Sequence, residues 1–293
     1  MALREVEGDA GLDLGEVLGP SSEIATRRPL SGWRRVLAGL ALPAVLLATW
    51  AVLSGTGVLS DRIFPSPGDL AHSAHDFVAA PRRAPVPGVV PFKGAAVRHI
   101  RASVGRWAQG YAIAVCVGLP LGLGLGLSRW MAAALDPLYQ AVRSVPITAW
   151  LPIALVWFGL GEGAARFLIF IGAVSPIVVA TADSTARVPR QLVDTARMLG
   201  TRPRDLARRV YLPAALPGIV TGLRLGLTLG WTSVIVAELS GSTSGLGAMM
   251  FAAREVTRLD QIIIGMATFG IIGLVGDVLL RTVARPFVRW ADA

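Results

Sequence analysis

The fold is decided by a stretch without a single charge, which reads Trp107-Ala-Gln-Gly-Tyr-Ala-Ile-Ala-Val-Cys-Val-Gly-Leu-Pro-Leu-Gly-Leu-Gly-Leu-Gly-Leu-Ser128. A helix needs about 20 apolar residues to cross the hydrocarbon core of a bilayer, and this stretch meets that length. A second charge-free stretch covers Val36–Ser60. A buried helix of a soluble protein rarely needs so long an apolar run. The chain is therefore predicted to be an integral membrane protein.

The composition agrees with a membrane protein. Of the 293 residues, 53% are hydrophobic and 16% are charged, whereas soluble domains carry about a quarter charged residues. The net charge is +9, and Lys93 is the only lysine. Arginine collects in the cytoplasmic loops of membrane proteins. Because zinc-finger spacing and basic-aromatic interleaving are both absent from the sequence, nucleic-acid binding is not favoured.

Apolar patterning predicts an all-α protein with about six transmembrane helices. The expected spans are Val36–Leu53, Trp107–Ser128, about Leu138–Leu160, Phe167–Ala182, Leu216–Ala237 and Gln261–Leu280. The transmembrane domain then covers 36–285. Residues 1–35 are expected to form an acidic, disordered cytoplasmic tail rather than a cleavable signal peptide. Residues 286–293 are expected to form a cytoplasmic C-terminal tail.

Arginine distribution predicts the orientation. Most arginines fall in the loops on the side of the N-terminus, and Arg143 is counted among them. This favours both termini in the cytoplasm. The first outer loop departs from the rule, because it carries several basic residues between Arg62 and Arg106.

Glycine recurs at every fourth residue in two of the expected spans, a spacing that lets helix backbones approach closely in lipid. The residues are Gly118, Gly122 and Gly126, and then Gly222, Gly226 and Gly230. Pro146 and other prolines predict breaks that either line a cavity or only curve the helices. Arg224 and Asp277 lie near the predicted cytoplasmic face. We expect them to snorkel or to pair rather than to relay protons.

A patterned loop at about 184–213 joins the fourth and fifth spans. Pro189 suits a helix start and Gly200 a helix stop. Between them an apolar stripe is predicted to comprise Leu192, Ala196 and Leu199. A second short helix is expected to begin near Pro203 and to carry Leu206 and Val210. The pattern predicts a compact cytoplasmic knob of two short helices.

This loop resembles that of ABC importer permeases. Their pattern is Glu-Ala-Ala, three residues, Gly, nine residues, Ile, one residue and Leu-Pro. The chain matches that spacing with Asp194, Thr195, Ala196, Gly200, Val210, Leu212 and Pro213. Aspartate replaces the family glutamate and shortens its reach. Further segments, among them Ala149-Trp-Leu-Pro152 and Trp157-Phe-Gly-Leu-Gly-Glu162, are similar to the nitrate/sulfonate/taurine branch.

The resemblance implies a type I (MetI-like) permease bundle in a bacterial inner membrane. The loop would act as a coupling helix docked on a cytoplasmic ATP-binding subunit, and an extracytoplasmic binding protein would deliver a small anionic solute. A second permease subunit, by default an identical copy, would complete the pathway. The chain has no P-loop, since Phe92 precedes its only lysine. Neither enzymatic activity nor a cofactor is expected in this chain, and ATP and Mg²⁺ would bind the partner ATPase.

Position and polarity suggest four residues for the translocation pathway: Trp150, Ser175, Thr232 and Glu238. Glu238 ends the fifth span, where it could pair or help to hold a gate. No metal site is expected, because nothing near His72 and His75 completes one.

Two other hypotheses remain. An ion-gradient-driven secondary transporter or channel would also use kinked spans and intramembrane charges. A membrane enzyme is a weaker alternative, because the sequence offers neither a metal-ligand cluster within the bilayer nor a serine-histidine pairing.

Overall fold

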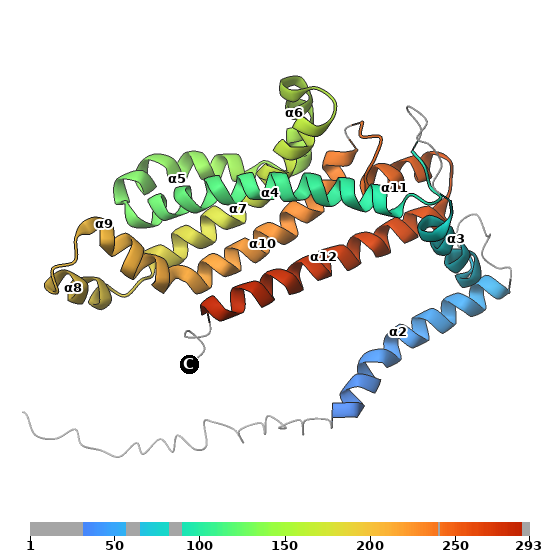
Figure 1. Cartoon of the computed structure of the whole chain (residues 1–293), viewed down its shortest axis with the longest axis horizontal. Coiled ribbons are helices and arrows are strands. Elements are labelled where there is room, and N and C mark those ends of the chain that lie inside the picture. The colour runs from blue at the N-terminus through green and yellow to red at the C-terminus, as the bar shows by residue number, and fades with distance from the viewer. Residues whose placement is uncertain (1–31, 57–64, 82–89, 240, 289–293) are drawn as a thin grey trace, which may run out of the picture. The chain divides into compact units, whose positions relative to one another are not determined.

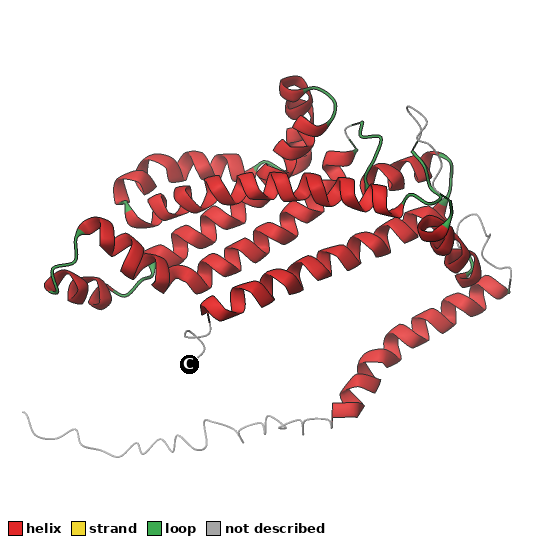
Figure 2. Cartoon of the chain, viewed as in Figure 1, coloured by secondary structure: helices red, strands yellow, loops and turns green. Residues whose placement is uncertain are grey.

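The computed structural model describes residues 32–56, 65–81, 90–239 and 241–288. Figure 2 shows that these residues form helices and loops, without a strand among them. The chain divides into two units, 1–53 and 54–293, and each is described by itself. Most of the predicted tail, residues 1–31, lies outside the described residues.

The first unit contains most of helix α2 (Gly32–Gly55). This helix contains the predicted first span and extends it at both ends. Its described apolar stretch, Ala44–Gly55, is shorter than a membrane span.

Four long helices form the body of the second unit: α4 (Ala96–Leu127), α7 (Glu162–Ala186), α10 (Leu212–Glu238) and α12 (Leu259–Val288). All four are long and apolar enough to cross a membrane. Figure 1 shows them side by side. The short helices α8 (Arg190–Met198) and α9 (Pro203–Leu206) lie at one end, hereafter the α8 end. The helix α11 (Leu246–Glu255) lies at the other, the α11 end.

The loop that precedes α4 contains a further helix, α3 (Pro67–Ala79). Ser66 caps it, because its side-chain oxygen accepts a hydrogen bond from the Asp69 N–H at 3.1 Å. The sequence pattern, dominated by turn residues, did not predict this helix. The expected second span, Trp107–Ser128, is the later part of a longer helix, α4, which begins at Ala96.

The glycine faces seat α4 and α10 against neighbouring sides of α7, where Ile177 meets glycines of both helices. A β-carbon added at Gly122 of α4 would lie 2.6 Å from the Thr181 β-carbon and 2.8 Å from the Val178 carbonyl oxygen. A β-carbon at Gly226 of α10 would lie 2.7 Å from an Ile177 side-chain carbon and 2.9 Å from a carbonyl oxygen of α7. These separations leave room for hydrogen alone, so the predicted close packing is confirmed.

The expected third span, about Leu138–Leu160, is broken near Pro146, as its prolines predicted. The chain forms α5 (Arg129–Ser144), a 3₁₀ turn η1 (Ile147–Trp150) and α6 (Leu151–Phe158). The segments 129–143 and 147–158 meet at 91°. Pro146 explains the break, because proline disfavours the helical conformation of the residue before it. Val145 is accordingly extended, with φ −78° and ψ 121°.

Arg224 and Asp277 pair across α10 and α12, as expected. The Arg224 Nε and Nη2 atoms donate to the two Asp277 carboxylate oxygens at 2.9 and 3.2 Å. This bidentate geometry gives each charge its counter-charge between two helices that are long enough to span a membrane.

Substitution of Gly122 by alanine should destabilise the bundle by about 1–3 kcal/mol, because the added carbon forces α4 away from the α7 backbone. The measurement is the midpoint of thermal unfolding in detergent. Gly105→Ala is the matched control on the same helix, since its β-carbon would meet nothing within 4 Å. Equal midpoints for the two variants would contradict the packing argument.

Candidate functional site

Helix α8 presents the residues of the family pattern at the α8 end of the bundle. Asp194, Thr195 and Ala196 lie in its middle, and Gly200 follows its end. Gly200 has φ +79°, a backbone conformation that favours glycine. Its N–H donates to the Arg197 carbonyl at 2.9 Å, and the Thr201 N–H donates to the Ala196 carbonyl at 3.1 Å. Gly200 therefore ends the helix, as the sequence predicted.

The knob folds back on the start of α10. Val193 and Leu206 are buried together with Ala215 and Ile219 of α10. Val210 lies in one π-helical turn, η2 (Ala207–Tyr211), which continues directly into α10 at Leu212 and Pro213. The family pattern thus spans one compact unit that is fixed to a candidate membrane span.

The predicted apolar stripe of α8 is mostly exposed, and the buried apolar residue of this helix, Val193, lies outside the stripe. Val193 is buried and Ala196 is partly buried, whereas Leu192 and Leu199 are exposed. Met198 and Leu199 are 87% and 81% exposed. The Asp194 carboxylate is also exposed, and its nearest ion-pair partner is Arg197 at 3.6 Å. An apolar edge beside an uncovered carboxylate is the character of a docking surface.

Two of the four predicted pathway residues line one cavity. Ser175 of α7 and Thr232 of α10 face a cavity of about 370 Å³ at the bend between α5 and η1. Trp150 does not line this cavity, and its ring packs against Phe167 with centroids 6.2 Å apart. Glu238 belongs to a separate cluster at the α11 end.

Sequence reasoning missed two residues of this cavity, Tyr139 and Arg143. Arginine counting assigned Arg143 to a cytoplasmic flank. In the structure it follows Arg129 by 14 residues along α5, which is about 21 Å at 1.5 Å per residue. The signal that could have located it is Pro146, which ends α5 within the expected span.

Arg106 and Glu238 form the centre of a buried cluster at the α11 end. The Arg106 Nη1 donates to the Glu238 carboxylate at 2.9 Å, and the Nε donates to the Glu162 carboxylate at 2.9 Å. Arg106 is 5% exposed and Glu238 1%. Ser103 and the Gly247 N–H donate to the Glu238 carboxylate at 2.6 and 2.7 Å. Glu238 therefore pairs, the first of the two roles considered for it.

The same cluster fixes the turn that leads into α11. The Gly245 N–H donates to His99 Nδ1 at 3.0 Å, and His99 Nε2 lies 2.8 Å from the Pro91 carbonyl. The ring thus accepts at one nitrogen and donates at the other, as neutral histidine does. Gly245 has φ +127°, and a β-carbon there would collide with the Glu238 carboxylate.

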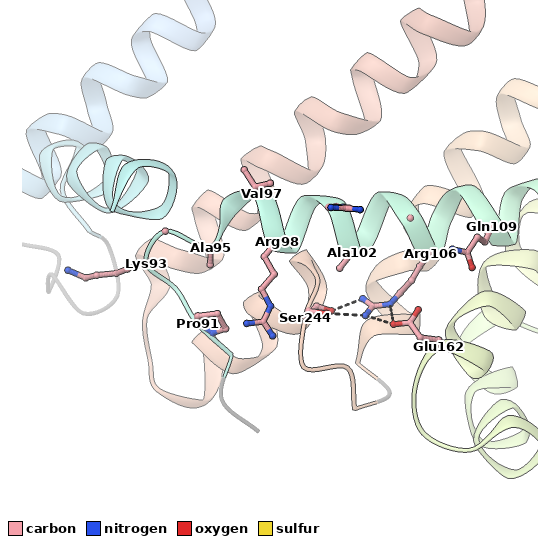
Figure 3. Close-up of a pocket in the computed structure, with 13 residues that line it drawn as sticks. Pro91, Lys93, Ala95, Val97, Arg98, Ala102, Arg106, Gln109, Glu162 and Ser244 are labelled. Atoms are coloured by element: carbon pink, nitrogen blue, oxygen red, sulfur yellow. Dashed lines mark hydrogen bonds and ion pairs between the residues drawn. The ribbon is translucent and has the colours of Figure 1, made fainter. Parts of the chain in front are cut away.

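Figure 3 shows the cavity beside this cluster, which has a volume of about 600 Å³. Arg98 and Arg106 project into it from one face of α4, opposite Ser244 and Glu162. Because Arg106 already pairs with two carboxylates, its charge is compensated within the protein.

Removal of Arg106 should lower the folding stability of the protein. Arg106→Leu leaves the Glu238 carboxylate buried without its counter-charge, which typically costs about 3–5 kcal/mol of folding free energy. Thermal unfolding in detergent measures the loss. The double variant Arg106→Leu/Glu238→Leu should recover part of it, because the carboxylate that remains without Arg106, that of Glu162, is half-exposed.

The control for this pair is Arg281→Leu, which breaks an exposed ion pair with Asp277. Exposed pairs contribute about 0–1 kcal/mol. A drop for Arg281→Leu as large as that for Arg106→Leu would contradict the role of burial.

Comparison with known proteins places the chain among membrane transport components. A family model described as "Binding-protein-dependent transport system inner membrane component" matches residues 115–291. A putative aliphatic sulfonates transport permease of Bacillus subtilis is 32% identical over 262 residues, covering 89% of each chain.

Two further relatives carry different solute names. A taurine transport system permease of Escherichia coli is 31% identical, covering 92% of this chain and 94% of the relative. A bicarbonate transport system permease of Synechococcus elongatus is 35% identical, covering 89% and 94%. Among solved structures, an inward-facing MetNI methionine ABC transporter matches with a TM-score of 0.53 at 22% identity. That match covers 64% of this chain and 95% of the other, and it supports the fold.

Proposed function

The chain belongs to the family of inner membrane components of binding-protein-dependent transport systems, and we propose that it is one membrane-spanning half of an ATP-driven importer for a small anionic solute. The chain itself is not the ATPase, because it lacks a P-loop. ATP and Mg²⁺ would bind the partner subunits, and an extracytoplasmic binding protein would deliver the solute.

The observation that carries the proposal is the uncovered knob at the α8 end. It holds the spaced pattern from Asp194 to Pro213, and it joins α10 without a flexible linker. A partner subunit that moved α8 would move α10 with it. Rigid transmission of this kind is how nucleotide-driven closure reorients a helix bundle.

The second half of the pathway is proposed to be an identical copy. None of the residues of α5 is buried. Its exposed side chains include Trp130 and Leu138, which are large and apolar. A two-fold partner could cover this helix, since homodimers present the same patch from both subunits.

The proposed orientation places the α8 end and both chain termini in the cytoplasm of a bacterial cell. The arginine-rich knob supports it, with Arg190, Arg197, Arg202, Arg208 and Arg209 within one loop. The anionic class of the solute is supported by relatives that are named for sulfonates, taurine and bicarbonate.

The main test is a pull-down of the tagged protein in mild detergent, with partners identified by mass spectrometry and ATP hydrolysis assayed on the eluate. The wild type should retain an ATPase. Leu199→Asp places a charge on the exposed edge of α8, and recovery of the ATPase should fall about tenfold or more, as for an interface hot spot. Gly200→Pro should act similarly, because proline requires φ near −65° and Gly200 has φ +79°.

The matched control is Val256→Asp, which adds the same charge at an exposed apolar residue beyond α11. It should retain the ATPase. A wild type that brings down no ATPase, with uptake that survives ATP depletion and follows an ion gradient, would instead establish a secondary transporter.

A further inference from the structure

We propose that the cavity at the bend between α5 and η1 is an anion-binding site, in which Arg143 supplies the positive charge for a sulfonate, carboxylate or phosphate group. Its place on the translocation route rests on the function proposed above. Its preference for anions is argued from the residues that line the cavity and from their hydrogen bonds.

The cavity lies between the middle of α7 and the C-terminal part of α10. Ser175 is 13 residues after the start of α7 at Glu162 and 11 before its end at Ala186. Thr232 and Ser233 contribute from α10, and Tyr139 and Arg143 from α5. The volume of about 370 Å³ lies within the range of ligand pockets, roughly 300–1,000 Å³.

Arg143 is the single charged residue that lines this cavity. Among the described residues it has no ion-pair or hydrogen-bond partner. Two arginines of the long helices differ, because Arg106 meets Glu162 and Glu238, and Arg224 meets Asp277. Arg143 is exposed, so the cavity carries an accessible positive charge that no described carboxylate compensates.

Arg143 lies in the last turn of α5, where the negative end of the helix dipole favours a cation. The guanidinium offers five N–H donors in a plane that matches the oxygen atoms of sulfonates, carboxylates and phosphates.

Three of the four hydroxyl groups that line the cavity already donate hydrogen bonds, and that of Ser175 accepts one from Tyr139 at 3.1 Å. Tyr139 donates to the Ser175 carbonyl at 2.7 Å. Thr232 and Ser233 both donate to the Leu229 carbonyl, at 2.9 and 2.6 Å. Arg143 is therefore the main uncommitted donor, and the rest of the wall is fixed by its own hydrogen bonds. Such an arrangement selects an anion over a cation without strong affinity for any one shape.

The test measures the charge preference of the cavity through an introduced cysteine. Thr232→Cys is made in a Cys116→Ala background, and the protein is purified in detergent together with the partners that bind it. Modification rates of the introduced thiol are compared for 2-sulfonatoethyl methanethiosulfonate, which is anionic, and its trimethylammonium analogue, which is cationic. Both are measured without nucleotide and with Mg-ATP and vanadate.

Arg143→Gln should lower the anionic-to-cationic rate ratio at the introduced thiol by about threefold to tenfold, because a unit charge acts with opposite sign on the two reagents and is screened by water and salt. Arg143→Lys should retain most of the ratio. Arg129→Gln is the matched control, because it removes the same charge from the same helix about 21 Å away. It should leave the ratio unchanged.

Ligand occupancy is tested with butanesulfonate as the probe. It should slow cationic modification of the introduced thiol when arginine or lysine stands at position 143, but not in Arg143→Gln. Protection by phosphatidylglycerol in nanodiscs without any protection by butanesulfonate would assign the charge to lipid phosphate, and it would overturn a solute site.

Three other results would overturn the proposal: no modification of the introduced thiol by either reagent in both nucleotide states, a ratio insensitive to Arg143→Gln, or an equal fall for Arg129→Gln. These outcomes are separate from failure of the importer function. The rate ratio requires no transport, whereas the pull-down of the partner ATPase does not depend on Arg143.

Discussion

Contact between helix backbones at α7 is the constraint on which the rest of the bundle depends. In lipid the hydrophobic effect does not drive helices together, so close packing must supply the attraction. Glycines of α4 and α10 provide it from two sides, where even one added carbon at Gly122 or Gly226 would meet the α7 backbone. The three helices then form a unit with little freedom to slide. The Arg224–Asp277 pair joins α12 to it. Nucleotide-driven motion would have to turn this unit as a whole.

The two ends of that unit are built differently. At the α11 end, Glu238 accepts from Arg106, Ser103 and the Gly247 N–H, so polar groups are satisfied internally and the turn into α11 is fixed. At the α8 end, the short helices leave an apolar edge and a carboxylate uncovered. The polar groups of the α11 end are paired within the chain, whereas the α8 end has an exposed surface to which a partner could bind. Between them lies the cavity at the α5 bend, with its lone guanidinium.

Sequence patterns predicted the features that depend on local spacing. Charge-free runs located the long helices, glycine at every fourth residue indicated the contact faces, and Gly200 marked the end of α8. Features that depend on distant partners were not predictable in the same way. Arg143 lies at the cavity because the chain bends at Pro146. A count of arginines in the loops cannot detect such a bend. Likewise, 132 residues separate Arg106 from Glu238. No periodicity links such residues, and only the packed helices bring them together.

The exposed edge of α8 has a consequence for how the protein must be made. Met198 and Leu199 are mostly uncovered, and unpaired apolar surface in water invites aggregation and recognition by chaperones and proteases. A subunit synthesised in excess of its partner would display that edge continuously. Assembly would hide it. In the complex, these two side chains would lie in the contact that transmits motion. In a chain without its partner, they would mark that chain for removal. Balanced synthesis of the subunits is then a condition for the survival of the protein in the cell.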